Sequence, residues 1–174
     1  TLNSLTIANG LASSAFTAGG VTVLAPSIPA AGGATLNVTD CVFSGNSTAS
    51  AFSSGAIMLG SGNASLTVAN SSFTGNSGNS ILTAGAIFSF SSGTITITNS
   101  TFESNSGSSG AVSNGTGSLT VSGSTFAGNS ATSSGGAIDA AFAGTITNST
   151  FYANSAAVAG DAIRFGSVGD LPEL

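Results

Sequence analysis

The side chains that could perform acid–base or metal chemistry are few in this sequence. Its 174 residues include no histidine and no lysine. The ionisable groups apart from one cysteine and one tyrosine are Asp40, Asp139, Asp161, Asp170, Glu103, Glu173 and Arg164. Enzymes that cleave acidic polysaccharides need clustered carboxylates, calcium or basic groups to hold the sugar and move protons. So small a set makes an enzyme an unfavourable interpretation, and we predict no catalytic residue.

Three of these groups are expected to approach one another. Asp139 and Arg164 each follow an isoleucine that occupies an equivalent position in neighbouring copies of a repeat, and Asp161 lies close to Arg164 in sequence. We interpret this group as a structural or surface ion pair. Asp40 occupies a turn position in the same repeat, and Glu103 follows a core phenylalanine and is expected to face solvent.

A nucleophile or a metal site is equally unsupported. The single cysteine, Cys41, aligns with serines in the other repeats, and no histidine is present to activate its thiol. The sequence has no Cys/His spacing typical of a metal site, and it lacks the glycine- and aspartate-rich nonapeptide that binds calcium in other β-helices. We therefore predict no metal and no cofactor.

The composition excludes several classes of partner. Only 4% of the residues are charged, whereas about a quarter is usual, and 41% are hydrophobic. A chain with one cationic side chain cannot neutralise a nucleic-acid backbone or an anionic membrane surface. No apolar run is long enough for a transmembrane helix, so no transmembrane segment is predicted. One cysteine cannot form an internal disulfide, so repetitive hydrogen bonding and packing must stabilise the fold.

A repeat of 24 to 30 residues predicts the elements that position these groups. Each copy has a short apolar alternation, then Phe-x-x-Asn, then Gly-Ala-Ile or a variant. With three short β segments per copy and no helical periodicity, the repeat fits one coil of a β-solenoid, in which coils stack at the strand spacing. We predict an all-β parallel β-helix of about six coils, the first a degenerate copy that begins at Leu5-Thr-Ile7.

Equivalent positions of stacked coils should form columns along the solenoid. Phenylalanines are expected to stack in the interior, at Phe43, Phe73, Phe102, Phe126 and Phe151. Asparagines three residues later are expected to form a hydrogen-bonded amide ladder, at Asn46, Asn76, Asn105, Asn129 and Asn154. Residues that tolerate a left-handed backbone are expected to mark a corner, at Asp40, Asn70, Asn99, Gly123 and Asn148.

The same repeats suggest the domain organisation. Residues 1–165 are expected to form a single β-helix domain, with an irregular insertion near 24–33 where two prolines interrupt the pattern. Residues 166–174 are expected to form a C-terminal tail or cap.

The alternation of the two motifs resembles the repeats of polymorphic outer membrane proteins, the chlamydial autotransporter passengers, and of related large secreted bacterial proteins. The resemblance covers about residues 34 to 165, and Gly135-Gly-Ala-Ile138 is the full tetrapeptide of that repeat. It implies a right-handed parallel β-helix, a secreted or cell-surface location, and a role in adhesion or as a structural extension.

Three functions share this scaffold. Because uncharged strand edges favour pairing with other chains, our first hypothesis is a non-catalytic extracellular structural subunit that self-associates, end to end or laterally, into a fibre or surface layer. A cell-surface adhesin, with a host or neighbouring cell as partner, is the alternative. A threonine-rich outward column also allows an ice-binding or glycan-binding face. It reads Thr6, Asn37, Thr67, Thr96, Thr120 and Thr145, and a second column lies two residues on.

Overall fold

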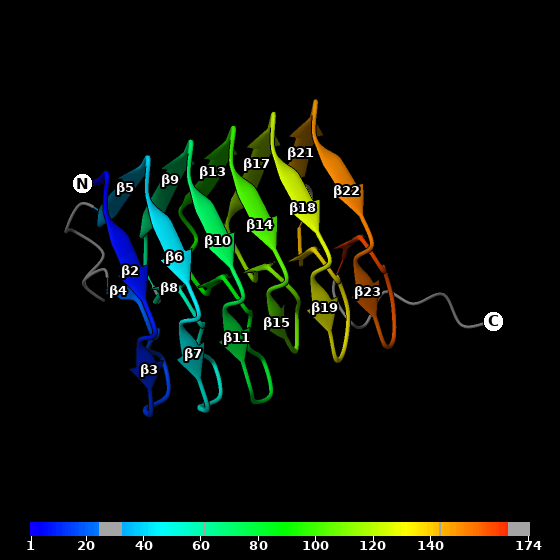
Figure 1. Cartoon of the computed structure of the whole chain (residues 1–174), viewed down its shortest axis with the longest axis horizontal. Coiled ribbons are helices and arrows are strands. Elements are labelled where there is room, and N and C mark those ends of the chain that lie inside the picture. The colour runs from blue at the N-terminus through cyan, green and yellow to red at the C-terminus, as the bar shows by residue number, and fades with distance from the viewer. Residues whose placement is uncertain (25–32, 61, 143, 167–174) are drawn as a thin grey trace.

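The fold is a parallel β-helix of six coils (Figure 1). The computed structural model describes residues 1–24, 33–60, 62–142 and 144–166, and in these residues the chain forms 24 short strands and no helix. The strands lie in four parallel sheets of six strands, and each coil contributes one strand to each sheet. The predicted fold class is therefore confirmed. The described residues hold no helix that is long and apolar enough to cross a membrane.

Each sheet runs the length of the stack. The first sheet contains β1 (Leu2–Asn3), β5 (Thr35–Thr39), β9 (Ser65–Ala69), β13 (Thr94–Thr98), β17 (Ser118–Ser122) and β21 (Gly144–Thr147). The second contains β2 (Thr6–Ala8), β6 (Val42–Ser44), β10 (Ser72–Thr74), β14 (Thr101–Glu103), β18 (Thr125–Ala127) and β22 (Thr150–Tyr152). The third contains β3 (Leu11–Ala12), β7 (Ser47–Thr48), β11 (Ser77–Gly78), β15 (Ser106–Gly107), β19 (Ser130–Ala131) and β23 (Ser155–Ala156). The fourth contains β4 (Val21–Val23), β8 (Ile57–Leu59), β12 (Ile87–Ser89), β16 (Val112–Asn114), β20 (Ile138–Ala140) and β24 (Ile163–Phe165).

Each coil has four strands, so the expectation of three short β segments is wrong. The additional strand belongs to the third sheet, where each strand has only two residues. Two residues are too few to show an alternation of polar and apolar side chains, which is the signal that marks a strand in sequence. We refer to β1–β4 as coil 1, β5–β8 as coil 2, and so on to β21–β24 as coil 6.

The first coil begins earlier than its sequence pattern indicates. Leu2 pairs with Val38 and Ile7 pairs with Phe43, so Leu5-Thr-Ile7 does not align with the first strand of the later coils. Ile7 packs against the core in the phenylalanine column, whereas Leu5 is 45% exposed. Thr6 pairs with Val42 and so lies outside the threonine column to which it was assigned.

The core is a set of columns inside the coils. Adjacent phenylalanine rings of the column are parallel to within 1–4°, with centroids 4.7–4.9 Å apart. This distance equals the spacing of hydrogen-bonded strands, so the in-register pairing of the second sheet is what stacks the rings. Branched aliphatic side chains from the first and fourth sheets fill the rest of the interior.

The loops that connect the third sheet to the fourth are longer in the first three coils than in the last three. Residues 13–20, 49–56 and 79–86 form the longer loops of coils 1–3, and residues 108–111, 132–137 and 157–162 form the shorter loops of coils 4–6. Beside the longer loops, Met58 and Phe88 are buried in a second apolar cluster with Ala84, packed against Ala18, Phe52 and Phe90. The residues 25–32 of the expected insertion and 167–174 of the expected tail lie outside the described part of the chain.

The stacked column predicts a large cost for truncating one of its rings. Phe102 is fully buried between Phe73 and Phe126. Phe102→Ala should lower the free energy of unfolding by about 3–5 kcal/mol, because the ring leaves a cavity that the parallel backbones cannot close. Urea unfolding followed by circular dichroism measures the loss. The matched control, Phe142→Ala, removes a ring that is 59% exposed and should change stability by less than about 0.5 kcal/mol; equal losses in the two variants would contradict this account of the core.

Candidate functional site

The asparagine column forms a continuous hydrogen-bonded ladder. From Asn46 to Asn154, each Nδ2 donates to the Oδ1 of the next asparagine at 2.9–3.0 Å. The backbone N–H of each asparagine donates to the same oxygen at 3.0–3.1 Å. The second Nδ2 hydrogen goes to a carbonyl of the preceding coil, for example from Asn105 to Phe73 at 2.9 Å. The amides within the ladder are therefore occupied by structural bonds.

Corners with a left-handed backbone lie on both sides of the phenylalanine column. The five predicted corner residues have φ between 47° and 58°: Asp40, Asn70, Asn99, Gly123 and Asn148. A second corner, missed in the sequence, directly precedes the asparagine position and has φ between 52° and 62°: Asn9, Gly45, Gly75, Ser104, Gly128 and Ala153. Glycine at three of these six positions was the available signal.

Cys41 lies in a column of hydroxyl groups. The backbone N–H of Ser71 donates to the Oγ of Ser100 at 3.1 Å, and Ser100 donates in the same way to Ser124. Cys41 donates its N–H to the Oγ of Ser71, and its Sγ lies 3.1 Å from the carbonyl oxygen of Thr39. The thiol is thus buried among structural hydrogen bonds.

One ion pair connects the coils of the C-terminal half. Arg164 contacts Oδ1 of Asp139 through Nε at 2.8 Å and Nη2 at 2.5 Å, and Ser109 donates its hydroxyl to Oδ2 of Asp139 at 2.9 Å. This set links coils 4, 5 and 6 on the outer side of the fourth sheet. Asp161, expected near the pair, instead accepts a hydrogen bond from the backbone N–H of Ala156 at 2.9 Å.

The remaining carboxylates are dispersed. Asp40 and Glu103 are exposed at a corner and on β14. Asp170 and Glu173 lie outside the described residues. Within the ranges that the structure describes, no three His, Cys, Asp or Glu side chains are grouped so that they could hold a metal ion.

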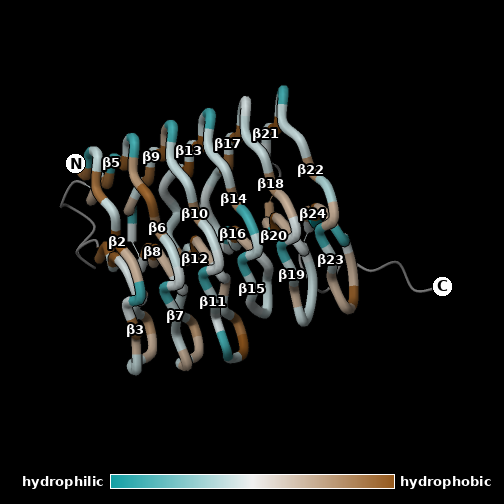
Figure 2. The backbone as a smooth tube through the Cα atoms, in the orientation of Figure 1, coloured by the Kyte–Doolittle hydropathy of each residue, from teal (hydrophilic) through white to brown (hydrophobic). Residues whose placement is uncertain are grey.

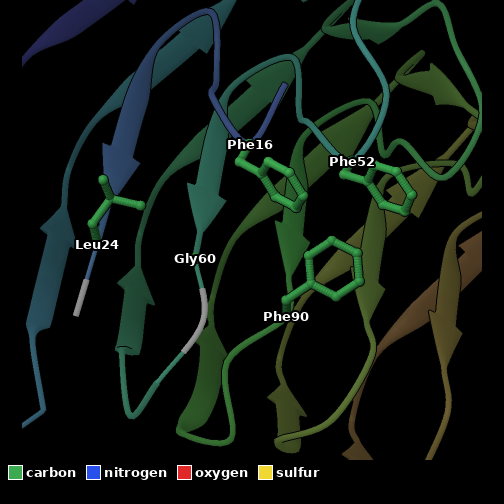
Figure 3. Close-up of a pocket in the computed structure, with 5 residues that line it drawn as sticks. All are labelled: Phe16, Leu24, Phe52, Gly60 and Phe90. Carbon is green, nitrogen blue, oxygen red and sulfur yellow. The ribbon is translucent and has the colours of Figure 1, made fainter. Parts of the chain in front are cut away.

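An apolar groove lies on coils 1–3. It has a volume of about 460 Å³ and is lined by Phe16, Leu24, Phe52, Gly60 and Phe90 (Figure 3). The rings of Phe16 and Phe52 stack with centroids 5.4 Å apart, and the ring of Phe90 is tilted against both at 6.2 and 5.7 Å. Gly60 contributes no side chain between Leu24 and Phe90, and the Cδ2 atom of Leu24 lies 2.6 Å from the position that a Cβ on Gly60 would take.

The loops beside the groove expose further apolar side chains, and some of these residues have an unfavourable backbone conformation. Ile81 is 69% exposed and Leu82 50% exposed, and Figure 2 shows an apolar, brown stretch in the loop after β11. Phe16, Phe52 and Leu82 all have φ near 50–60°, a conformation unfavourable for bulky residues. Strained residues of this kind concentrate at functional positions. We define the apolar loop face as Phe16, Leu24, Phe52, Ile81, Leu82 and Phe90.

The apolar loop face was missed in the sequence, although a signal existed. Phe16, Phe52 and Leu82 each precede the isoleucine or valine of the second motif by five residues, so they form a column of their own. With five apolar or glycine residues as its lining, the groove offers no side-chain acid, base or metal ligand. It can bind only apolar or aromatic groups.

The outer face of the first sheet carries two columns in which most side chains have a hydroxyl group. Asn37, Thr67, Thr96, Thr120 and Thr145 are in register, and so are Thr39, Ala69, Thr98, Ser122 and Thr147 two residues on. Neighbouring members of a column are separated by the strand spacing, about 4.8 Å. This flat, polar face is the second candidate surface.

Comparison of the chain with protein-family models, with curated proteins and with solved structures finds no match. The resemblance to polymorphic outer membrane proteins therefore rests on the repeated motifs alone. The repeated parallel strands in four stacked sheets are those of a β-solenoid.

The ladder predicts a large penalty for a buried charge. Asn105 is fully buried, and its Nδ2 donates to Phe73 and Asn129. At neutral pH, Asn105→Asp would place a carboxylate against two acceptors, and we expect stability to fall by at least about 3 kcal/mol. Chemical denaturation measures the change. Asn79→Asp, at an exposed loop position, is the control and should have little effect; a tolerated Asn105→Asp would contradict the ladder.

Proposed function

We propose that this protein is a non-catalytic extracellular structural subunit, a β-solenoid that self-associates laterally through its apolar loop face into a fibre or surface layer. A secreted or cell-surface location is part of the proposal. It is supported by the motif pair, which resembles the repeats of exported surface proteins.

The observation that carries the proposal is the apolar loop face itself. Contiguous exposed apolar surface rimmed by polar residues is typical of protein–protein contacts. Phe16, Leu24, Ile81 and Leu82 are each at least half exposed, and no charged side chain lines the groove beside them. Burying such rings against a second molecule would release ordered water at little desolvation cost.

The use of the polar residues also supports a structural role. The asparagine and serine columns form their hydrogen bonds between neighbouring coils, and the corner residues serve as turns with a left-handed backbone. The ion pair of Asp139 and Arg164 is likewise a link between coils. Chemistry-bearing groups therefore stabilise a rigid stack, and rigidity is what a layer or fibre requires.

The terminal coils favour lateral over end-to-end association. Head-to-tail stacking would place coil 1 of one copy on coil 6 of another and match apolar columns, such as Ile7 with Phe151. However, coil 1 has Leu5 where coils 3–6 have the serine hydroxyl acceptor, and it has Gly10 where coils 2–6 have the asparagine. In a head-to-tail contact, the N–H of Ser149 would therefore lack a hydroxyl acceptor, and the N–H of Asn154 would lack an amide oxygen acceptor.

An adhesin is the alternative, because a cell-surface partner could supply the apolar groups that occupy the groove. An ice-binding or glycan-binding solenoid would instead use the hydroxyl columns of the first sheet. The adhesin and the ice- or glycan-binding solenoid predict a chain that stays monomeric when its ligand is absent.

Lateral assembly can be tested by replacing two residues of the apolar loop face. Asparagine suits the left-handed backbone of Phe16 and Leu82, so Phe16→Asn/Leu82→Asn should preserve the fold while removing two apolar contacts. Sedimentation velocity and electron microscopy of the full chain at micromolar concentrations should show oligomers for the unmodified chain. The double variant should sediment mainly as a monomer.

The matched control is Phe142→Asn/Val158→Asn, which removes two exposed apolar side chains outside the apolar loop face. It should associate like the unmodified chain. A monomeric unmodified chain would reject self-assembly and would favour the adhesin or the ice- or glycan-binding solenoid. Equal association of both double variants would reject the apolar loop face as the contact.

A further inference from the structure

In coils 1–5, a glycine lies two residues before the isoleucine or valine of the second motif, and these glycines form a column. Coil 6 has a different residue at this position. A Cβ on Gly55, Gly110 or Gly136 would collide with a backbone carbonyl of the next coil, and one on Gly85 would collide with the next coil's Ser106 nitrogen. Glycine is therefore required where a further coil packs on that side. In coil 6 the register places Asp161 at this position. Asp161 directs a Cβ and a carboxylate toward the side on which a further coil would pack.

The Asp161 carboxylate also occupies an edge donor. Ser155 donates its N–H to Asn129 and Ala157 donates to Ala131, and both acceptors are in coil 5. Successive N–H groups of a strand point in opposite directions, so the N–H of Ala156 faces away from coil 5. It donates to Oδ1 of Asp161 at 2.9 Å. The carboxylate thus takes the place of the carbonyl that another coil would supply.

Coil 1 is poorly matched to the same surface. Leu5 offers no hydroxyl for Ser149, and Gly10 offers no amide oxygen for Asn154. Asparagine could not be accommodated at Gly10 without a shift, because a Cβ there would collide with the carbonyl of Gly19. The missing acceptors of coil 1 and the Asp161 side chain affect different corners of the contact between coil 6 of one copy and coil 1 of another.

We propose that Asp161 is a stop residue, which keeps the strand edges of coil 6 from pairing with coil 1 of a second copy of this chain. Charged side chains at sheet edges are a general protection against edge-to-edge pairing. Here the side chain acts in three ways: its Cβ blocks the approach of the next backbone, its carboxylate satisfies Ala156, and its charge would be buried by a docked coil. The inference depends on the contacts of coil 6 and goes beyond the proposed lateral assembly.

The test measures association of the full chain with its lateral contact removed. In the Phe16→Asn/Leu82→Asn background, Asp161→Gly restores the residue found in the other coils, whereas Asp161→Asn keeps the Cβ and an oxygen acceptor. Asp161→Gly should form linear oligomers in sedimentation velocity and electron microscopy, at a concentration at least about tenfold below that needed by Asp161→Asn.

In the Asp161→Gly variant, Leu5→Ser supplies a hydroxyl acceptor for the N–H of Ser149. The variant with Leu5→Ser should associate about fivefold more tightly than the variant with Leu5→Ala. Identical sedimentation of Asp161→Gly and Asp161→Asn in folded chains would overturn the proposal.

Amide exchange keeps the proposal falsifiable if Asp161→Gly does not fold. The N–H of Ala156 should remain protected in Asp161→Asn and lose at least about tenfold of its protection in Asp161→Ala. Equal exchange in these two variants would also overturn the proposal. Failure of the lateral hypothesis gives a different result, a monomeric unmodified chain, so the two proposals can be rejected separately.

Discussion

The fold depends on how the corner N–H groups find acceptors. A solenoid turns sharply several times per coil, and at each turn the backbone leaves the regular sheet pattern that would satisfy its donors. Here the next coil supplies side-chain oxygens, from asparagine at one corner and serine at another. Because each oxygen must lie directly above its donor, the coils are held in register, and the same register stacks the phenylalanines at 4.7–4.9 Å.

This arrangement explains why a chain with so little charge can be a stable, ordered protein. Asparagine, serine and glycine, which are usually found in loops, here perform repeated structural tasks inside the coils. Three of the charged groups stabilise the stack too: Asp139 and Arg164 link neighbouring coils, and the Asp161 carboxylate accepts a hydrogen bond at an edge. What is left for recognition is surface: apolar rings on the long loops and flat columns of hydroxyls.

Most of the fold could be predicted from the sequence, because repetition converts spacing directly into columns. The phenylalanine and asparagine positions, such as Phe102 and Asn105, recur three residues apart in coils 2–6. Their columns could therefore be predicted without knowing the conformation of the loops. The degenerate coil 1 was misaligned because Ile7, not a phenylalanine, fills its core position. The apolar loop face escaped prediction because the direction of a long loop depends on what packs beneath it, in this case Met58 and Phe88. The role of Asp161 depends on a backbone contact that only three-dimensional register reveals.

Residue-resolved amide hydrogen exchange of the full chain tests the central claim, that side-chain oxygens of successive coils hold the corners, most directly. The account predicts strong protection at Asn76, Asn105 and Asn129, whose N–H groups donate to the next asparagine. The N–H of Asn154, which has no such acceptor among the described residues, should exchange much faster. Uniform exchange along the column, or fast exchange at Asn105, would contradict the claim that the ladder organises the fold.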